Sequence, residues 1–280
     1  MHTAVMPPPA APPQSVDPLG TTGAPGARPH GSGPGPRRAD TGPGPAPAPQ
    51  AGPGLSPLLA TLQLTDSAFP TGFYTLSHGL EGFAQATAVD AQTLPLLLAD
   101  LLLHGVGPAD GTALALAHRA AAVNDWARVI EVDEHLYAAK LNREVRQAAT
   151  RTGRQLLDLA AEVFDDPRIR AYADIVADRR APGTQAVAAG VIHCAAGVPV
   201  REAVAADLFA FSISFVGAAV RLRLTDHRRA QVLLRGAAPQ IEQATEQALR
   251  RELADMGSSL FAVDAVSGRH ERAEARLFAS

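Results

Sequence analysis

The spacing of apolar residues along the chain predicts an all-α fold. From about residue 56 onward, leucine, alanine and valine recur every three or four positions, and no useful length alternates apolar with polar residues. One stripe, which steps through Val204, Leu208, Phe211 and Phe215, is typical of a helix in the centre of a core. We therefore expect residues 55–280 to form a single-domain helical bundle of about ten helices.

Capping and breaking residues set the expected limits of these helices. Ser56 and Thr75 are expected to be N-caps, and Gly105 and Gly107 are expected to end the helix that contains the leucines from residue 94 to 102. The expected helices cover about residues 57–64, 75–83, 94–104, 109–123, 127–139, 142–163, 167–181, 185–196, 199–222 and 226–252, the last with an interruption near residues 236–239.

The segment between residues 62 and 83 is expected to be a packing centre. Pro70 and Gly72 predict a sharp turn, because proline restricts one backbone angle and glycine frees another. Gly79 and Gly82 would lie one turn apart on the helix that follows, which is unfavourable unless another backbone approaches closely.

Residues 1–54 differ sharply from the rest of the chain. Sixteen of the 23 prolines lie in residues 1–57, where they alternate with glycine and alanine. Such a composition buries too little apolar surface to offset the entropy of ordering, so we expect a disordered N-terminal extension. It has no apolar stretch after a basic start, so a signal peptide is not expected.

Composition narrows the class of protein. A net charge of −3 argues against nucleic-acid binding. The one cysteine, Cys194, lies in an apolar run, which indicates a buried thiol in a reducing, cytoplasmic protein. The longest apolar run, residues 208–220, is 13 residues long, shorter than the roughly 20 that span a bilayer, so no membrane segment is expected.

Residues 70–81 carry a resemblance to a known family. They read Pro70-Thr-Gly72-Phe-Tyr74-Thr-Leu-Ser77-His78-Gly79-Leu80-Glu81. This resembles the Pro-x-Gly-x-Phe-x-x-Ser-x-Gly-Leu-Glu pattern near the start of the urease accessory protein UreF family. Tyr74 takes the aromatic place, and Phe73 stands where that family tends to have a small residue.

Two later segments extend the resemblance, so that it spans about residues 56–280. Asn142-Arg143-Glu144 through Gly153-Arg154-Gln-Leu-Leu resembles an internal helix of the family. His270-Glu271 and Arg276-Leu277-Phe278-Ala279-Ser280 resemble its closing His-Glu and Arg-Leu-Phe-x-Ser pattern. The chain departs from the family at Gln185, where a Gly-His pair is usual, and at Ala279, where Arg is usual.

The resemblance implies a non-catalytic chaperone of urease maturation, without a cofactor. Proteins of this family are similar in being all-α dimers that bind the accessory protein UreD (also called UreH) and the GTPase UreG. Together they deliver nickel to apo-urease, and the family member acts as adaptor and as regulator of the GTPase. The matching positions are the candidate partner-binding residues: Pro70, Gly72, Tyr74, Ser77, His78, Glu81, Arg143, Arg154, His270, Glu271, Arg276, Leu277 and Phe278.

An enzymatic alternative centres on His78 and Glu81. Three positions apart on a helix, they would share a face and could supply two metal ligands, which favours a helical metal-dependent enzyme if further ligands converge there. The other interpretation is a hydrogen-bonded pair that fixes the loop. Ser77 and His78 are adjacent, about 100° apart on a helix, so they cannot form a nucleophile and base pair. The chain has no Gly-x-x-x-x-Gly-Lys phosphate loop, so nucleotide hydrolysis is not expected.

The sequence allows two interpretations of the arginine-rich helix face, and two of the C-terminal segment. Arginines 143, 146, 151 and 154 form either a solvated helix face or a contact for an acidic partner. Residues 270–280 either dock on the chain's own bundle or become ordered against a partner. On the second interpretation, removal of residues 270–280 is expected to leave the melting temperature nearly unchanged.

Overall fold

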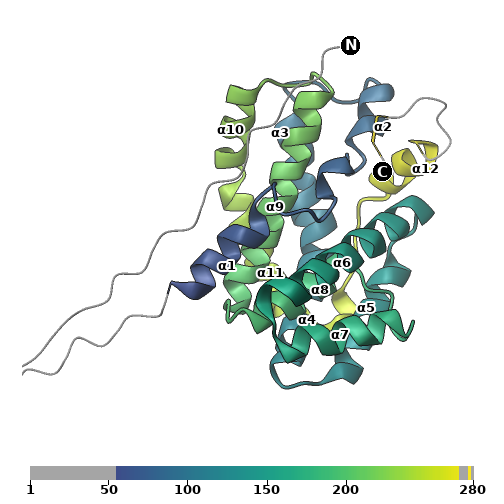
Figure 1. The fold of residues 1–280 in the computed structure, drawn as a ribbon. Coiled ribbons are helices and arrows are strands. Elements are labelled where there is room, and N and C mark those ends of the chain that lie inside the picture. Colours follow the sequence, from purple (N-terminus) through teal and green to yellow (C-terminus); the bar gives the residue numbers. More distant parts are fainter. Residues whose placement is uncertain (1–54, 271–276, 279–280) are drawn as a thin grey trace, which may run out of the picture. The chain divides into compact units, whose positions relative to one another are not determined.

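The computed structural model describes residues 55–270 and 277–278, and throughout these ranges the regular structure is helical (Figure 1). This confirms the expected all-α class. The expected extension, residues 1–54, and the candidate residues Glu271 and Arg276 lie outside the described residues, as does the side chain of His270. The helices are α1 (Ser56–Thr65), α2 (Leu80–Gln85), α3 (Leu94–Asp100), α4 (Thr112–Ala122), α5 (Trp126–Ala139), α6 (Arg143–Phe164), α7 (Pro167–Ala177), α8 (Gln185–Ala195), α9 (Val200–Arg221), α10 (His227–Gly236), α11 (Ala238–Arg250) and α12 (Phe261–His270), with 3-10 turns η1 (Phe73–Thr75) and η3 (Leu253–Asp255) and a π-helix η2 (Leu101–Gly111).

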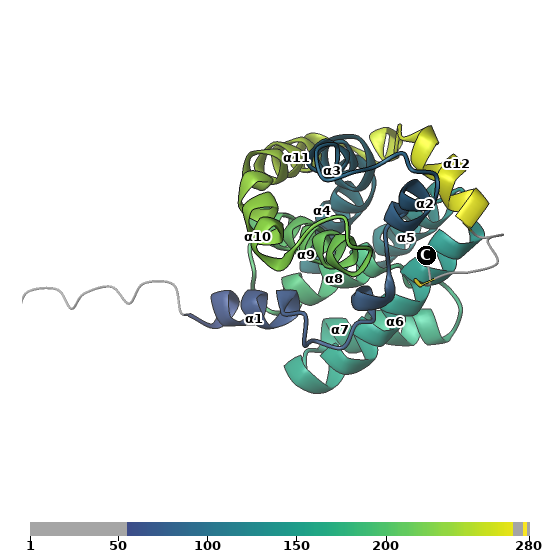
Figure 2. The ribbon, with the colours of Figure 1, turned by 90° about the horizontal axis from the view of Figure 1, so that it is seen from above.

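Helix α9 is the centre of the bundle. It packs against α1, α2, α4, α8, α10 and α11, and the view from above shows it between α10 and α8 (Figure 2). Val204, Leu208, Phe211 and Phe215 are buried, as the stripe predicts. By length and composition α9 could cross a membrane, with 22 residues and a mean hydropathy of 1.9, but half of its apolar window is buried among the other helices. In the bundle it is a core helix.

The predicted limits hold best for the helices from α5 to α11. Asp125 caps α5 and Asp166 caps α7, each by accepting a hydrogen bond from a backbone N–H in the first helical turn. Pro167 follows Asp166 at the start of α7, where its missing N–H costs nothing. The break predicted before α8 is a turn at Gly183, whose φ of 77° is readily adopted only by glycine.

The prediction that Gly105 and Gly107 end a helix is wrong. The chain continues from α3 through η2 into α4 without a break, and Pro108 lies inside the π-helix. A Cβ on Gly107 would lie 2.2 Å from the carbonyl oxygen of Leu102 and 3.0 Å from Cβ of Ala244 in α11. The glycine therefore permits a wide π-turn and the close approach of α11, and does not mark a helix end.

The predicted N-caps Ser56 and Thr75 are also wrong. Ser56 is the first residue of α1, and Leu55 precedes it. Thr75 ends the short turn η1, where its hydroxyl donates to the carbonyl of Gly72 (2.8 Å). Helix α2 begins only at Leu80, because His78 and Gly79 both have positive φ, 55° and 83°.

Candidate functional site

The segment 70–81 and the end of the chain meet in the structure. The carboxylate of Glu81, in the first turn of α2, accepts hydrogen bonds from the backbone N–H groups of Leu277 (2.7 Å) and Phe278 (3.0 Å). Glu81 is only 4% exposed. Hydrogen bonds to an ionised acceptor are shorter and stronger than neutral ones, so this carboxylate fixes the chain end beside the segment that resembles the family motif.

Arg221, at the end of α9, joins the two segments from the other side. Its guanidinium lies 4.0 Å from the ring centroid of Tyr74 and 4.3 Å from that of Phe278. Its Nη1 also donates to the carbonyl oxygen of Tyr74 (2.6 Å). A guanidinium over an aromatic face is attracted by the ring quadrupole, so one arginine stabilises both segments.

This arrangement leaves two apolar side chains facing outward. Tyr74 is 68% exposed and Leu277 65%, whereas Phe278 is 5% exposed and belongs to the core. We call Tyr74, Arg221, Leu277 and Phe278 together the Arg221 surface. Arg221 lies outside the segments that resemble the family, and an arginine in the last turn of a helix is common, so its position in the sequence gives no signal of this role.

His78 makes internal contacts with helix α9. Its Nε2 lies 2.9 Å from Oγ of Ser214, and that hydroxyl donates to the carbonyl oxygen of Phe73 (3.0 Å), so Nε2 carries the proton. The imidazole also packs edge-on against Phe211, with ring centroids 4.5 Å apart. Burial, with smaller effects of Lys140 and Arg221, lowers the pKa of His78 to about 3, so the ring is neutral.

His78 and Glu81 therefore do not form a shared metal site. His78 precedes α2 and hydrogen-bonds to α9, while both carboxylate oxygens of Glu81 accept from the chain end. Within residues 55–270 and 277–278, no group of three or more His, Cys, Asp or Glu could hold a metal ion.

Some of the remaining candidate residues are exposed, and others are buried or contact neighbouring elements of the fold. Pro70 is exposed and Ser77 is fully buried. Gly72, with φ of 82°, lies so close to α6 that a Cβ there would be 2.7 Å from Oε1 of Gln155. Arg154 of α6 donates to the carbonyl of Pro182 (3.4 Å), so part of the arginine face makes internal contacts.

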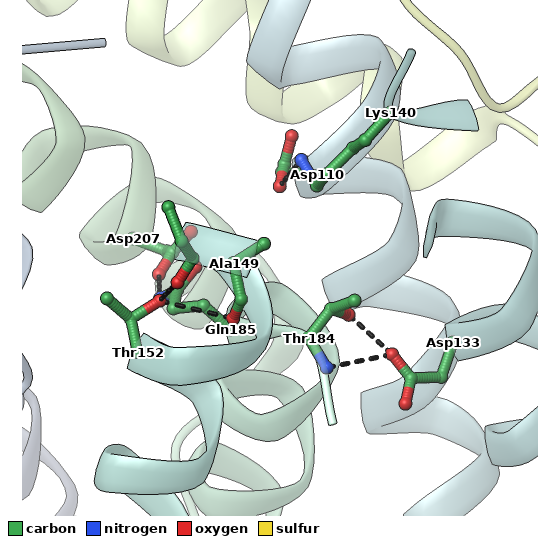
Figure 3. Close-up of polar contacts among 9 residues, drawn as sticks. Asp110, Asp133, Lys140, Ala149, Thr152, Thr184, Gln185 and Asp207 are labelled. Carbon is green, nitrogen blue, oxygen red and sulfur yellow. Dashed lines mark hydrogen bonds and ion pairs between the residues drawn. The ribbon is translucent and has the colours of Figure 1, made fainter. Parts of the chain in front are cut away.

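Two cavities lie beneath the segment that resembles the motif. One, of about 330 Å³, is bordered by η2, α6, α9 and α12, and the other, of about 690 Å³, lies between residues 64–74 and helices α8 and α9. Asp207 and Gln185 border both cavities, and Nε2 of Gln185 donates to Oδ1 of Asp207 (2.8 Å; Figure 3). Burial, followed by the nearby charge of Asp110, raises the pKa of Asp207 to about 7.

A second buried aspartate, Asp133, is fully engaged in hydrogen bonds that stabilise the fold. It accepts from the hydroxyl of Tyr172 (2.7 Å), the N–H of Gly183 (2.6 Å), and the N–H and hydroxyl of Thr184 (2.9 and 2.5 Å). These bonds attach α5 to α7 and to the turn before α8, and the two from Thr184 are visible in Figure 3.

Comparison with known proteins gives one consistent family. A family model described as UreF matches residues 88–238, more than half of the 280 residues. The urease accessory protein UreF 2 of Brucella canis is 32% identical over 222 residues, which cover 79% of this chain and 91% of that protein. The urease accessory protein UreF of Arthrobacter sp. (strain FB24) is 34% identical over 223 residues, 79% of this chain and 96% of that protein. That of Trichodesmium erythraeum is 30% identical over 227 residues, 81% and 98% of the two chains.

Proposed function

Because the chain belongs to the UreF family of urease accessory proteins, which are non-catalytic chaperones of urease maturation, we propose that it is the adaptor that bridges the accessory protein UreD/UreH and the GTPase UreG. In this role it regulates the GTPase while nickel is delivered to apo-urease. It acts in the cytoplasm, where its single buried thiol, Cys194, stays reduced.

The observation that carries the adaptor role is the junction made by Glu81. Its two hydrogen bonds hold Leu277 and Phe278 against the segment that contains Tyr74. Tyr74 and Leu277 are both exposed, and Arg221 contacts Tyr74 and Phe278, the residue next to Leu277. Tyrosine and arginine are enriched at interfaces and dominate their energetics, so we assign the UreD/UreH contact to the Arg221 surface.

The enzymatic alternative is not retained. The family is non-catalytic, and the two side chains on which the alternative rested make the separate internal contacts described above.

The expected homodimer is assigned to α1. Leu55, Leu58, Leu59 and Leu62 recur at positions i, i+3, i+4 and i+7, and each is at least 55% exposed. An apolar stripe on one helix can pair with its own copy across a two-fold axis, because each residue then meets a complementary residue of the same stripe. This proposal leaves the Arg221 surface available for the other partners.

Co-purification tests the adaptor role. The chain is co-expressed with UreD/UreH, UreG and apo-urease, and the partners retained on the tagged chain are quantified together with urease activity. Tyr74→Ala and Leu277→Ala should each reduce retained UreD/UreH at least tenfold and lower urease activity in parallel. Val123→Ala is the matched control, because Val123 is 74% exposed and lies between α4 and α5. Wild-type retention by both variants would show that partners bind elsewhere.

A further inference from the structure

Three carboxylates in the described part of the chain are more than nine-tenths buried, and they differ in how they are satisfied. Asp133 accepts four hydrogen bonds, and Glu81 accepts two from the chain end. Asp207, 9% exposed, accepts one from a residue that the structure describes, the amide of Gln185. A buried carboxylate with one neutral donor is costly unless a further donor or a cation reaches it.

The space next to Asp207 can supply that partner. Its cavity of about 330 Å³ falls in the size range of small-molecule sites, roughly 300–1,000 Å³. Most of its wall is apolar, with Leu208 and Phe211 of α9, Val145 of α6, and Leu260 and Phe261 at the start of α12. Apolar walls with a few convergent polar groups are typical of a ligand site.

The charges around this cavity favour a positive ligand. Among the residues that the structure describes, Asp110, Glu144, Asp207 and Asp264 border it, and Lys140 is the one lysine or arginine that does. Lys140 is already paired, because its Nζ lies 2.8 Å from Oδ1 of Asp110 (Figure 3). The pair is neutral as a whole, and among the described residues neither lysine nor arginine forms an ion pair with Asp207.

We propose that this cavity binds a small organic cation, an ammonium, amidinium or guanidinium group on an apolar body. The cationic group donates to Asp207, and the body packs against Leu208, Phe211 and Leu260. Gln185 holds one carboxylate oxygen and leaves the other for the ligand. The proposal rests on the contacts of Asp207 and Gln185 and does not depend on the adaptor role.

A divalent metal ion fits the cavity less well than an organic cation. No group of three potential metal-binding side chains occurs in the part of the chain that the structure describes. Most of the wall is apolar, so it offers few oxygen ligands to replace the hydration shell of a divalent ion. An amidinium spreads one charge over a planar fork, which matches the geometry of a carboxylate.

Titration of the full chain with benzamidine and with benzamide tests the proposal. The two compounds have nearly the same shape, but only benzamidine is charged. Isothermal titration calorimetry of the wild type at pH 8, above the pKa of Asp207, should show benzamidine binding at least tenfold tighter than benzamide. Asp207→Asn should weaken benzamidine at least tenfold and leave benzamide unchanged. Asp174→Asn is the matched control, because it removes the same charge from an exposed position on α7 and should change neither.

A second variant makes the test independent of Asp207. Ala149 borders the cavity from α6, and Ala149→Leu places a larger side chain in the space that the ligand would occupy. Both compounds should then lose binding while Asp174→Asn retains it. Equal affinities of the wild type for benzamidine and benzamide would overturn the proposal, as would benzamidine binding that survives Ala149→Leu. Displacement of benzamidine by equimolar Mg²⁺ or Ni²⁺ would also overturn it, in favour of a metal site.

Discussion

Gly79 shows how one residue determines where a helix begins. Its φ of 83° is a conformation that side chains with a Cβ rarely adopt, and it ends the turn from which α2 starts. A Cβ there would lie 3.2 Å from Oγ of Ser267 and 3.4 Å from Val263, both in α12. The sequence predicts that another backbone approaches closely here, whereas at Gly79 the near atoms belong to side chains of α12, and the glycine precedes the helix.

Replacement of Gly79 by leucine should destabilise the fold by about 1–3 kcal/mol, because the side chain is forced into a strained backbone and into α12. Urea unfolding followed by circular dichroism measures the change. Gly236→Ala is the control, since nothing lies within 4 Å of the added Cβ, and it should be neutral or stabilise by about 0.4–1 kcal/mol. Equal stability of Gly79→Leu and the wild type would show that α12 does not pack here.

Asp207 should make stability fall as pH rises. Its pKa is about 7 in the fold and ordinarily 3.8, so between these values the folded chain holds a proton that the unfolded chain has released. His78 and His193, with pKa values lowered to about 3 and about 4 by burial, have the opposite effect, and their stabilisation is lost as pH falls below 6.5. Asp110 and Lys140 also face Asp207 but form an ion pair.

Asp207→Asn isolates the contribution of this aspartate. The variant should gain about 3 kcal/mol of stability over the wild type as pH rises from 5 to 8, because about two pH units of this interval lie below the folded pKa of about 7 and each is worth about 1.4 kcal/mol. Thermal unfolding at several pH values measures the difference. Asp174→Asn, at an exposed position on α7, is the control for the loss of one carboxylate. A constant difference for Asp207→Asn would mean that its carboxyl is already ionised in the fold at pH 5.

At the scale of elements, sequence predicted helices well where polar caps and breakers surround a periodic stripe. Helices α5 to α9 have such signals, as in Asp166-Pro167 before α7. The prediction of a helix end at Gly105 and Gly107 was wrong because the sequence does not show whether a glycine ends a helix or allows another helix to pack closely. Gly107 does the second, against α11. It also placed His78 and Glu81 on one helix face, and a single left-handed turn at residues 78–79 separated their environments.

At the chain end, Phe278 packs in the core and Leu277 is exposed, so packing and partner binding can be tested separately. Phe278 is buried against Arg221, so the expectation that this end leaves the fold at little cost is not supported. Phe278→Ala should lower stability by about 2–4 kcal/mol, near the lower part of the range for a buried phenylalanine because the chain end can relax. Leu277→Ala, at an exposed position, should leave the melting temperature unchanged and reduce UreD/UreH capture. If both variants melted like the wild type, the end would not be packed in solution.

At the scale of the whole molecule, the sequence could not show which distant segments meet. The motif match named Glu81 and Phe278 separately, but periodicity reports only which face of a helix is apolar and not what covers it. The same limit applies to α1, whose apolar stripe is exposed in the structure.

The exposed stripe of α1 should control oligomeric state. Leu58→Glu with Leu62→Glu places two charges in the proposed dimer contact and should weaken self-association at least tenfold, as measured by light scattering during size-exclusion chromatography. Leu96→Glu is the control, because Leu96 is 65% exposed on α3 and should not affect association. A dimer that persists in the double variant would move the contact to another face.

The hydrogen bonds of Glu81 can form only after the ribosome has synthesised the end of the chain. Its partner Leu277 lies 196 residues further along the chain, which a ribosome translating roughly 5–20 residues per second needs about 10–40 s to reach. Until then the carboxylate of Glu81 is hydrated, and α2 lacks its hydrogen bonds to the chain end. A nascent chain stalled before residue 277 should therefore expose the segment from Pro70 to Glu81 to proteases, and release of the finished chain should protect it.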